Sequence, residues 1–136
     1  MVLALDNVKK SFPDGFMHVF ACEVSKPVQD FIKTYIKPGV LYGDIKKRRL
    51  AETPGGLHLY TAGFPCQPFS KSGLGLGYAD EARGQLVVYC IAHIKVNKPT
   101  SFIIENVVAL LEQHPEFFKV IIMQLMEIKS GGGEQL

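Results

Sequence analysis

Features typical of secreted, membrane and metal-binding proteins are scarce in this sequence. Its three cysteines, Cys22, Cys66 and Cys90, are widely spaced and form no Cys-x-x-Cys pair. An odd number at such spacing argues against a disulfide framework and a zinc site, and favours a reducing, intracellular setting. The histidines are isolated, with no pair three or four residues apart, so we expect no metal site.

Long apolar stretches are also missing. The longest strongly apolar runs, residues 86–92 and 120–126, are far shorter than the roughly 20 residues of a membrane-spanning helix. Residues 1–10 carry no basic segment before their apolar residues and no cleavage pattern, so we expect no signal peptide. These absences predict a protein without a membrane partner, in the nucleus of a eukaryotic cell or the cytoplasm of a bacterial one.

The chain carries only a small excess of positive charge. The 15 basic and 13 acidic residues give a net charge of +2, which is below the basic footprint of a typical DNA-binding domain. One denser run, Lys46 to Arg49, is interpreted as a solvated helix face or loop, with phosphate contact as the alternative. Charge alone therefore does not indicate a nucleic-acid partner.

Apolar runs typical of buried strands alternate with helical patterns along the chain. The alternation predicts an α/β fold with a parallel sheet flanked by helices. Residues 63–80, rich in glycine and proline, are expected to form a loop. The expected strands are residues 18–23, 57–62 and 101–105, and the expected helices are residues 26–37, 82–96 and 115–128.

Residues with reactive side chains gather where the predicted strands end. Glu23 closes the first strand, Cys66 follows the second, and Glu105 closes the third. Ligands of parallel sheets bind at the C-terminal ends of the strands. A right-handed crossover between the second and third strands would bring Cys66 and Glu105 to one edge.

Cys66 is the leading candidate for a nucleophile. Pro65 and Pro68 flank it, and because proline fixes φ and removes a backbone donor, the segment is expected to be stiff and exposed. A nucleophilic cysteine needs access and a fixed aim, whereas a structural cysteine needs neither. The structural alternative stays open for Cys66, and Cys22 and Cys90, inside apolar patterns, are expected to be core residues.

Glu105 closes an apolar run and precedes Asn106. A carboxylate at the mouth of a buried strand is costly unless it is paired, and such groups often have a raised pKa and a function. The alternative is a loop residue beside a helix N-terminus.

Together these segments resemble the cytosine-C5 DNA methyltransferase family. Residues 63–70, GFPCQPFS, and residues 105–107, Glu-Asn-Val, have the form and separation of the family's nucleophile loop and its ENV segment. Residues 80–86 resemble the family's Arg-Gly segment. Residues 21–23 and 43–45 resemble the two segments that hold the cofactor.

The resemblance covers residues 3–128 and implies an incomplete Rossmann-like fold of the S-adenosylmethionine-dependent methyltransferases. It implies a partial catalytic domain in residues 1–128 and a flexible tail in residues 129–136. The implied activity is that of a DNA (cytosine-5-)-methyltransferase. The Cys66 thiolate would add to carbon 6 of a flipped cytosine, and carbon 5 would take the methyl group of S-adenosylmethionine. Glu105 would contact the N3 and amino edge of the ring.

The resemblance also assigns the cofactor residues. Glu23 would accept the ribose hydroxyls of S-adenosylmethionine. Asp44 and Ile45 would hold its adenine. Pro65 and Leu86 would line the methyl-donor pocket.

Contacts to the target nucleotide and its phosphates are implied for Ser70, Arg83 and Asn106. Arg83 has an alternative role, because a surface salt bridge with Asp80 or Glu81 is equally compatible with the sequence.

A dinucleotide-binding role for the glycines of residues 73–77 is rejected. The run neither follows a strand directly nor opens a helix at the required spacing. In the family this region closes over DNA, and glycines suit such a hinge.

Three family segments are absent. Residues 1–5 contain no glycine-rich turn, and no Gln-x-Arg-x-Arg segment or target-recognition region follows Glu105. We therefore expect a fragment that is inactive alone and pairs with a complementary methyltransferase segment. The alternatives are a non-catalytic remnant or subunit that binds nucleic acid or such a segment, and a tRNA cytosine-C5 methyltransferase.

Overall fold

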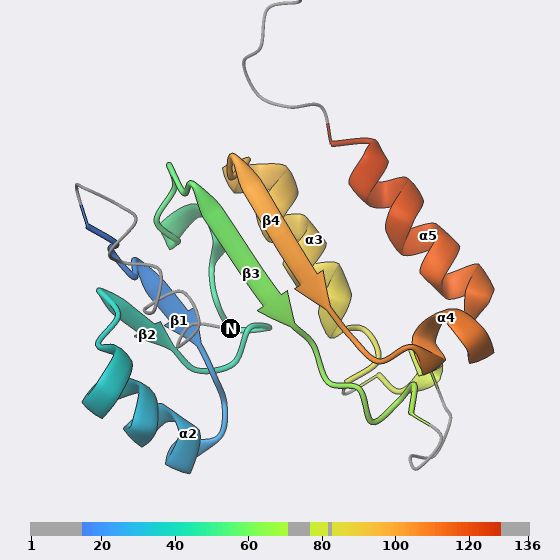
Figure 1. Ribbon diagram of the computed structural model, residues 1–136, viewed down its shortest axis with the longest axis horizontal. Coiled ribbons are helices and arrows are strands. Elements are labelled where there is room, and N and C mark those ends of the chain that lie inside the picture. The colour runs from blue at the N-terminus through green and yellow to red at the C-terminus, as the bar shows by residue number, and fades with distance from the viewer. Residues whose placement is uncertain (1–14, 71–76, 82, 129–136) are drawn as a thin grey trace, which may run out of the picture. The chain divides into compact units, whose positions relative to one another are not determined.

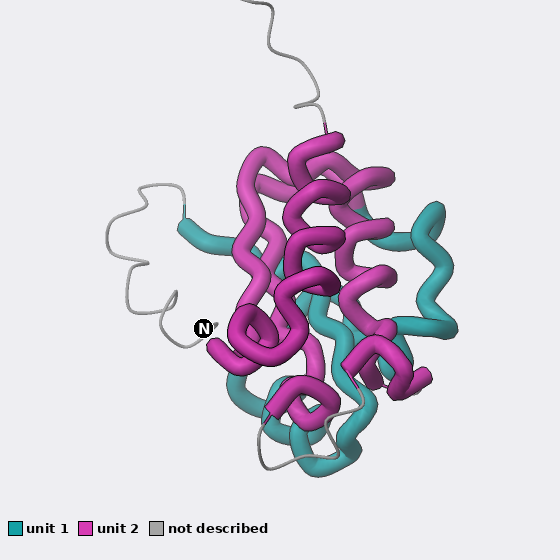
Figure 2. Tube along the Cα trace, turned by 90° about the vertical axis from the view of Figure 1, so that its right-hand side faces the viewer, with its two compact units in different colours: residues 1–54 teal, residues 55–136 magenta. Residues whose placement is uncertain are grey.

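The chain forms two compact units, one within residues 1–54 and the other within residues 55–136 (Figure 2). A computed structural model describes residues 15–70, 77–81 and 83–128. The element labels below are those of Figure 1.

The first unit is built on two short parallel strands joined by a helix. Strand β1, Phe20–Cys22, pairs with β2, Val40–Tyr42, with Cys22 opposite Tyr42. Between them, helix α2, Lys26–Phe31, continues into a π-helical turn, Ile32–Ile36. The first strand and the helix are the elements that the sequence predicts for this region.

Local chemistry sets the bounds of α2. Ser25 precedes the helix in an extended conformation and Pro27 lies in the first turn, where its missing N–H costs nothing. Ser25 makes no side-chain cap, and its own N–H donates to Glu23 Oε1 at 2.7 Å instead. The helical segment ends at Lys37, which has a left-handed φ of 51°.

Strand β2 was not predicted from the sequence. It is three residues long, too short for a periodic pattern, and the preceding Gly39 makes it possible. A Cβ at Gly39 would lie 2.8 Å from the carbonyl oxygen of Val19, and the Gly39 N–H donates to His18 at 2.9 Å. Only glycine lets the two backbones approach this closely.

The second unit repeats the strand, helix, parallel strand order and adds two helices. Strands β3 and β4 pair in parallel, with Gly63 opposite Glu105 at their C-terminal ends. The elements are β3, Leu59–Gly63; α3, Leu86–Asn97; β4, Ser101–Glu105; α4, Ala109–Gln113; and α5, Pro115–Met126.

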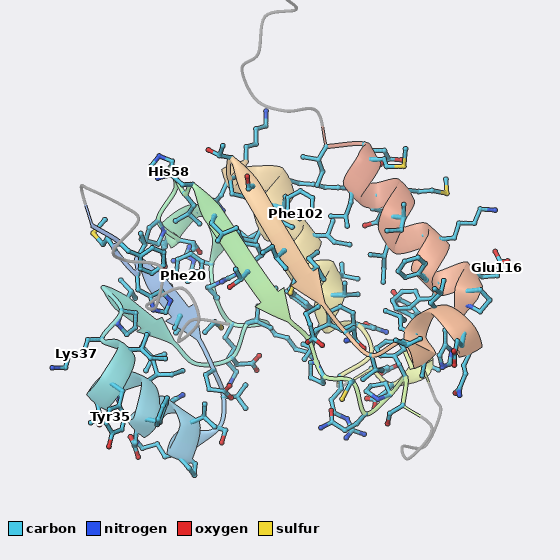
Figure 3. All side chains as sticks on the ribbon, viewed as in Figure 1. Phe20, Tyr35, Lys37, His58, Phe102 and Glu116 are labelled. Atoms are coloured by element: carbon cyan, nitrogen blue, oxygen red, sulfur yellow. The ribbon has the colours of Figure 1, made fainter. Side chains whose placement is uncertain are left out.

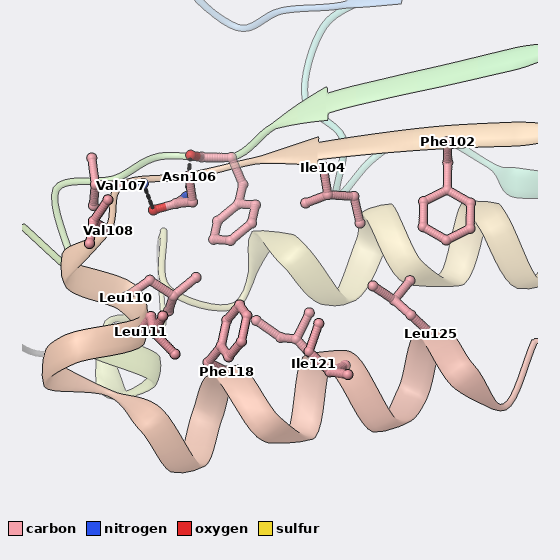
Figure 4. A pocket seen from close by; sticks show the side chains of 12 residues that line it. Phe102, Ile104, Asn106, Val107, Val108, Leu110, Leu111, Phe118, Ile121 and Leu125 are labelled. Carbon is pink, nitrogen blue, oxygen red and sulfur yellow. Dashed lines mark hydrogen bonds between the residues drawn. The ribbon is translucent and has the colours of Figure 1, made fainter.

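The core of this unit lies between the β3–β4 sheet and the helices. Figure 4 shows α3 and α5 beside the two strands, and Tyr60 of β3 stacks on His93 of α3 with ring centroids 4.4 Å apart. The buried apolar side chains of the core are Phe64, Phe69, Val87, Ile91, Leu110 and Ile121.

The predicted α/β class with parallel strands is confirmed, and the predicted elements are found with shifted ends. The helix expected from residue 82 begins at Leu86, because Arg83 to Gln85 form turns and the Gly84 N–H donates to Asp80 at 2.7 Å. The short helix α4 was not predicted. The proposed tail, residues 129–136, and the glycine run up to residue 76 lie outside the described residues, and the single catalytic domain stays a prediction.

Strand β4 is less buried than its apolar sequence suggested. Phe102 is 38% exposed and Ile103 48% exposed, and Phe102 can be followed in Figure 3. Ile104, on the same face as Phe102, packs against the core. An apolar pocket of about 350 Å³ separates this face from α4 and α5 (Figure 4).

Candidate active site

Cys66 begins a tight turn just beyond strand β3. Its carbonyl oxygen accepts hydrogen bonds from the Phe69 N–H at 2.9 Å and the Ser70 N–H at 2.8 Å. Pro65 and Pro68 stiffen the same turn because their φ angles are fixed. The Cys66 side chain is half-buried. The backbone that carries this thiol is therefore restrained on both sides.

Glu105 ends strand β4 directly beside the end of β3. Its register partner is Gly63, and a Cβ built on Gly63 would lie 3.2 Å from Glu105 Oε2. The absence of a side chain at Gly63 leaves space for the carboxylate. Glu105 is exposed, so the burial cost that the sequence suggested for it does not apply in this structure. The expectation that Cys66 and Glu105 follow neighbouring parallel strands agrees with the pairing of β3 and β4.

Asn106 ties the two strand ends together. Its Nδ2 donates to the carbonyl oxygen of Phe64 at 2.9 Å, and its Oδ1 accepts from the Val107 N–H at 2.9 Å (Figure 4). Both ends of the amide are thus engaged within the protein. This bracing role was missed by the sequence reasoning, which assigned Asn106 to substrate contact.

Arg83 forms the ion pair that was its alternative interpretation. Its Nη2 lies 2.8 Å and its Nε 3.0 Å from Asp80 Oδ2, while its backbone N–H donates to Asp80 Oδ1 at 3.0 Å. Asp80 is buried and Arg83 is exposed. The pair closes the turn that precedes α3, and a contact of Arg83 with phosphate stays a prediction.

The remaining predicted residues of this unit lie in the Cys66 turn or at the start of α3. Pro65 and Ser70 are half-buried in the turn. Leu86 is the first residue of α3 and packs against the core.

In the first unit, Glu23 and Asp44 follow the ends of the two paired strands. The Glu23 N–H donates to Tyr42 at 3.0 Å, and its backbone carbonyl accepts from Gln29 Nε2 at 2.6 Å. Asp44 Oδ1 accepts from the Lys46 N–H at 2.9 Å. Because β1 and β2 are parallel and in register, both carboxylates belong to one edge of this sheet. Ile45, half-buried, follows directly.

This pair of carboxylates suits a ligand that offers several hydrogen-bond donors. Each carboxylate has about four acceptor positions. Glu23 accepts a hydrogen bond from the Ser25 N–H, and Asp44 accepts one from the Lys46 N–H. The ribose diol and the amino group of an adenosine are donors of the required kind. The residues present therefore fit the adenosine part of S-adenosylmethionine.

The expectation that the whole basic run from Lys46 to Arg49 is solvated is wrong for Arg48. It is only 8% exposed, and its guanidinium lies over the Phe20 ring, 5.3 Å from the centroid. A guanidinium is weakly hydrated and stacks on aromatic faces, which lets it enter the unit where lysine would not. Its burial depends on the distant Phe20 and so could not be foreseen locally.

The other cysteines differ in burial. Cys90 is 3% exposed, as expected for a core residue. Cys22 is only half-buried, and its thiol donates to the Gly43 carbonyl oxygen at 3.1 Å. Burial raises the pKa of the Cys22 thiol, the Arg48 cation opposes that change, and the nearby Asp44 carboxylate adds to it.

Metal clusters and membrane-spanning helices are both absent from the described residues. Within residues 15–70, 77–81 and 83–128, no cluster of three or more His, Cys, Asp or Glu side chains is placed to hold a metal ion. No helix in those ranges is both long and apolar enough to cross a membrane.

Parallel strands that end in a cysteine-bearing turn and a glutamate place the chain among α/β proteins with polar and thiol side chains at the sheet edge. The profile of one family, described as C-5 cytosine-specific DNA methylase, matches residues 1–129. The chain belongs to this family.

Several bacterial relatives are similar to the chain. The Type II methyltransferase M.HaeII of Haemophilus aegyptius is 39% identical over 110 residues, which cover 79% of this chain and 33% of the relative. M.NlaIV of Neisseria lactamica is 38% identical, covering 68% and 22%, and M.BsuFI of Bacillus subtilis is 35% identical, covering 91% and 30%. The chain thus spans a third or less of the length of these relatives.

Proposed function

We propose that this chain serves in methyl transfer to carbon 5 of cytosine in DNA, with Cys66 as the nucleophile. The observation that carries the proposal is the pairing of Gly63 with Glu105, which sets the Cys66 turn and the Glu105 carboxylate beyond neighbouring strand ends. The family match supplies the reaction class.

Cys66 acts first. Its thiolate forms a bond to carbon 6 of the cytosine, and the π electrons of the C5–C6 bond move into the ring toward N3. Carbon 5 then has enamine character and can attack an electrophilic methyl group. Carbon 5 of free cytosine is a poor nucleophile, so the covalent step divides one difficult reaction into easier ones.

Glu105 is assigned to the ring edge. A carboxyl group beside N3 and the exocyclic amino group stabilises the charge that develops there when sulfur adds to carbon 6. Gly63 contributes by leaving that carboxyl free to approach the base. After transfer, water takes the carbon-5 proton, whose electron pair re-forms the C5–C6 double bond as the C6–S bond breaks and the Cys66 thiolate leaves.

The methyl donor that we propose is S-adenosylmethionine, which when bound supplies the electrophilic methyl group. Glu23 and Asp44 are its candidate hydrogen-bond acceptors in the first unit, with Ile45 against the adenine. Pro65 and Leu86 are the candidates in the second unit.

The proposed substrate is DNA with the target cytosine flipped out of the helix, because carbon 6 is unreachable in a stacked duplex. Ser70 and Arg83 are the proposed contacts near the target, and an intracellular location follows from the substrate. The family description specifies DNA, which does not favour the tRNA alternative.

A hybrid enzyme tests the proposal. Residues 59–107 of this chain would replace the matching segment of M.HaeII, and transfer of a labelled methyl group to DNA would be measured. We expect transfer by the hybrid and none when Cys66 is changed to serine. A folded hybrid that binds DNA and donor without any transfer would contradict the proposal.

A further inference from the structure

The Cys66 turn is anchored through Phe69. This side chain is fully buried, at 0% exposure, and its N–H makes one of the two hydrogen bonds to the Cys66 carbonyl. Its ring meets Phe64 edge-on at 5.8 Å, stacks on Phe117 at 5.7 Å and meets the ring of His114 edge-on at 5.6 Å. The position of Phe69 therefore depends on the junction between α4 and α5.

His114 makes a second contact to the same region of the chain. A Cβ built on Gly77 would lie 2.7 Å from both Nδ1 and Cε1 of His114, so the ring is in close contact with the glycine. Gly77 has a left-handed φ of 52°, and its N–H donates to the Pro68 carbonyl at 2.9 Å. This hydrogen bond connects Gly77 to the Cys66 turn.

The backbone of His114 is itself fixed between the two helices. Its N–H donates to Leu110 at 3.2 Å and its carbonyl accepts from the Phe118 N–H at 3.0 Å. The residue thus caps the end of α4 and precedes Pro115, the first residue of α5. A ring held in this way is a rigid support for whatever packs against it.

We propose that His114 is a positioning residue for Cys66. Its ring contacts both Phe69 and Gly77. The Phe69 N–H donates to the Cys66 carbonyl and the Gly77 N–H donates to the Pro68 carbonyl, so both residues restrain the Cys66 turn. The inference deepens the proposed function, on which its catalytic meaning rests. The support itself is a property of the fold and can be measured without DNA or methyl donor.

Truncation of the ring should loosen the turn. His114→Ala removes one of the three rings that contact Phe69 and leaves a void beside it, since buried sites collapse only partly. A nucleophile displaced by a fraction of an ångström loses its aim. The loosened Cys66 thiol should become more accessible to a small alkylating reagent.

The experiment follows the alkylation rate of each cysteine of the chain with iodoacetamide by peptide mass mapping. We expect His114→Ala to raise the Cys66 rate at least about twofold, while the rate of Cys90, buried in α3 of the same unit, stays unchanged. Gln113→Ala, at an exposed neighbouring position, is the matched control and should alter neither rate. An unchanged Cys66 rate in His114→Ala would overturn the inference, and so would a parallel rise at Cys90, which signals general unfolding.

A second variant approaches the contact from the loop. Gly77→Ala forces a methyl group against the His114 ring and also strains a left-handed φ. In the Gly77→Ala/His114→Ala double variant the clash is absent, and only the φ strain and the loss of the His114 ring remain, so its Cys66 rate should rise by less than the product of the two single effects. A rate equal to that product would show that the two residues act independently and would contradict the inference.

The two proposals can fail separately. If alkylation responds as expected while the hybrid enzyme transfers no methyl group, the support by His114 stands and the proposed function falls. If transfer depends on Cys66 but alkylation ignores His114, the function stands and this inference falls.

Discussion

Gly63 and Glu105 are register partners at the ends of β3 and β4, and a methyl group on Gly63 would lie 3.2 Å from the Glu105 carboxylate. That separation is tighter than an ordinary van der Waals contact. The lack of a side chain at Gly63 of β3 therefore leaves the space in which the Glu105 carboxylate lies.

Replacement of Gly63 by alanine tests this relationship. We expect Gly63→Ala to change the free energy of unfolding by no more than about 1 kcal/mol, because the loss of backbone freedom in the unfolded chain offsets the contact. The displaced Glu105 should slow methyl transfer by the hybrid enzyme about tenfold.

The matched control is Gly55→Ala in a hybrid extended to carry residues 55–107, where the added Cβ would make only an ordinary contact at 3.7 Å to Asn97. It should leave transfer unchanged. Equal transfer by the Gly63 and Gly55 variants would show that Glu105 does not need the space.

The brace formed by Asn106 gives a stability prediction. Asn106→Ala removes the hydrogen bond to the Phe64 carbonyl and leaves the Val107 N–H without its acceptor. We expect a loss of about 1–3 kcal/mol in urea denaturation. Asn106→Asp keeps the acceptor for Val107 but removes the donor to Phe64, so it should be nearly as unstable. Wild-type stability in Asn106→Asp would show that the Phe64 bond contributes little.

Part of the fold and of the candidate site could be predicted from the sequence, and part of it could not. The strand ends near Glu23 and at Glu105, and the loop that holds Cys66, follow from local patterns, since apolar runs and prolines act on their own neighbours. The burial of Arg48 against Phe20 and the contact of His114 with Gly77 join residues far apart in sequence. No local pattern encodes such contacts, and only the presence of a glycine at position 77 hinted at a close approach.

The Cys22 thiol gives a pH dependence. Burial, followed by the neighbouring carboxylates, raises its pKa above the ordinary value of 9.0 despite the Arg48 cation. Stability from the neutral thiol is fully present below the unfolded pKa and is lost as pH rises through the higher folded pKa.

Wild-type and Cys22→Ser chains should be compared by denaturant unfolding from about pH 7 to about pH 11, the range in which a thiol titrates. Serine keeps a donor for the Gly43 carbonyl but does not titrate in this range. We expect the wild type to lose more stability than the variant above about pH 9. Identical curves would contradict the assignment.

Glu23 gives a ligand-binding prediction. In calorimetric titration of the chain with S-adenosylmethionine, Glu23→Ala should weaken binding about tenfold through loss of a charge-assisted hydrogen bond. Glu23→Gln retains an acceptor for the Ser25 N–H, so its affinity should lie between those of the wild type and Glu23→Ala. Equal affinities for wild type and Glu23→Ala would remove Glu23 from the cofactor residues.

Covalent capture tests the central assignment of Cys66 most directly. A DNA duplex with 5-fluorocytosine at the target position would be incubated with S-adenosylmethionine and the M.HaeII hybrid that carries residues 59–107, since fluorine at carbon 5 prevents the final elimination. We predict a complex that survives denaturation, retained in a Cys90→Ser hybrid and lost in a Cys66→Ser hybrid. Capture that persists without the Cys66 thiol would contradict the account.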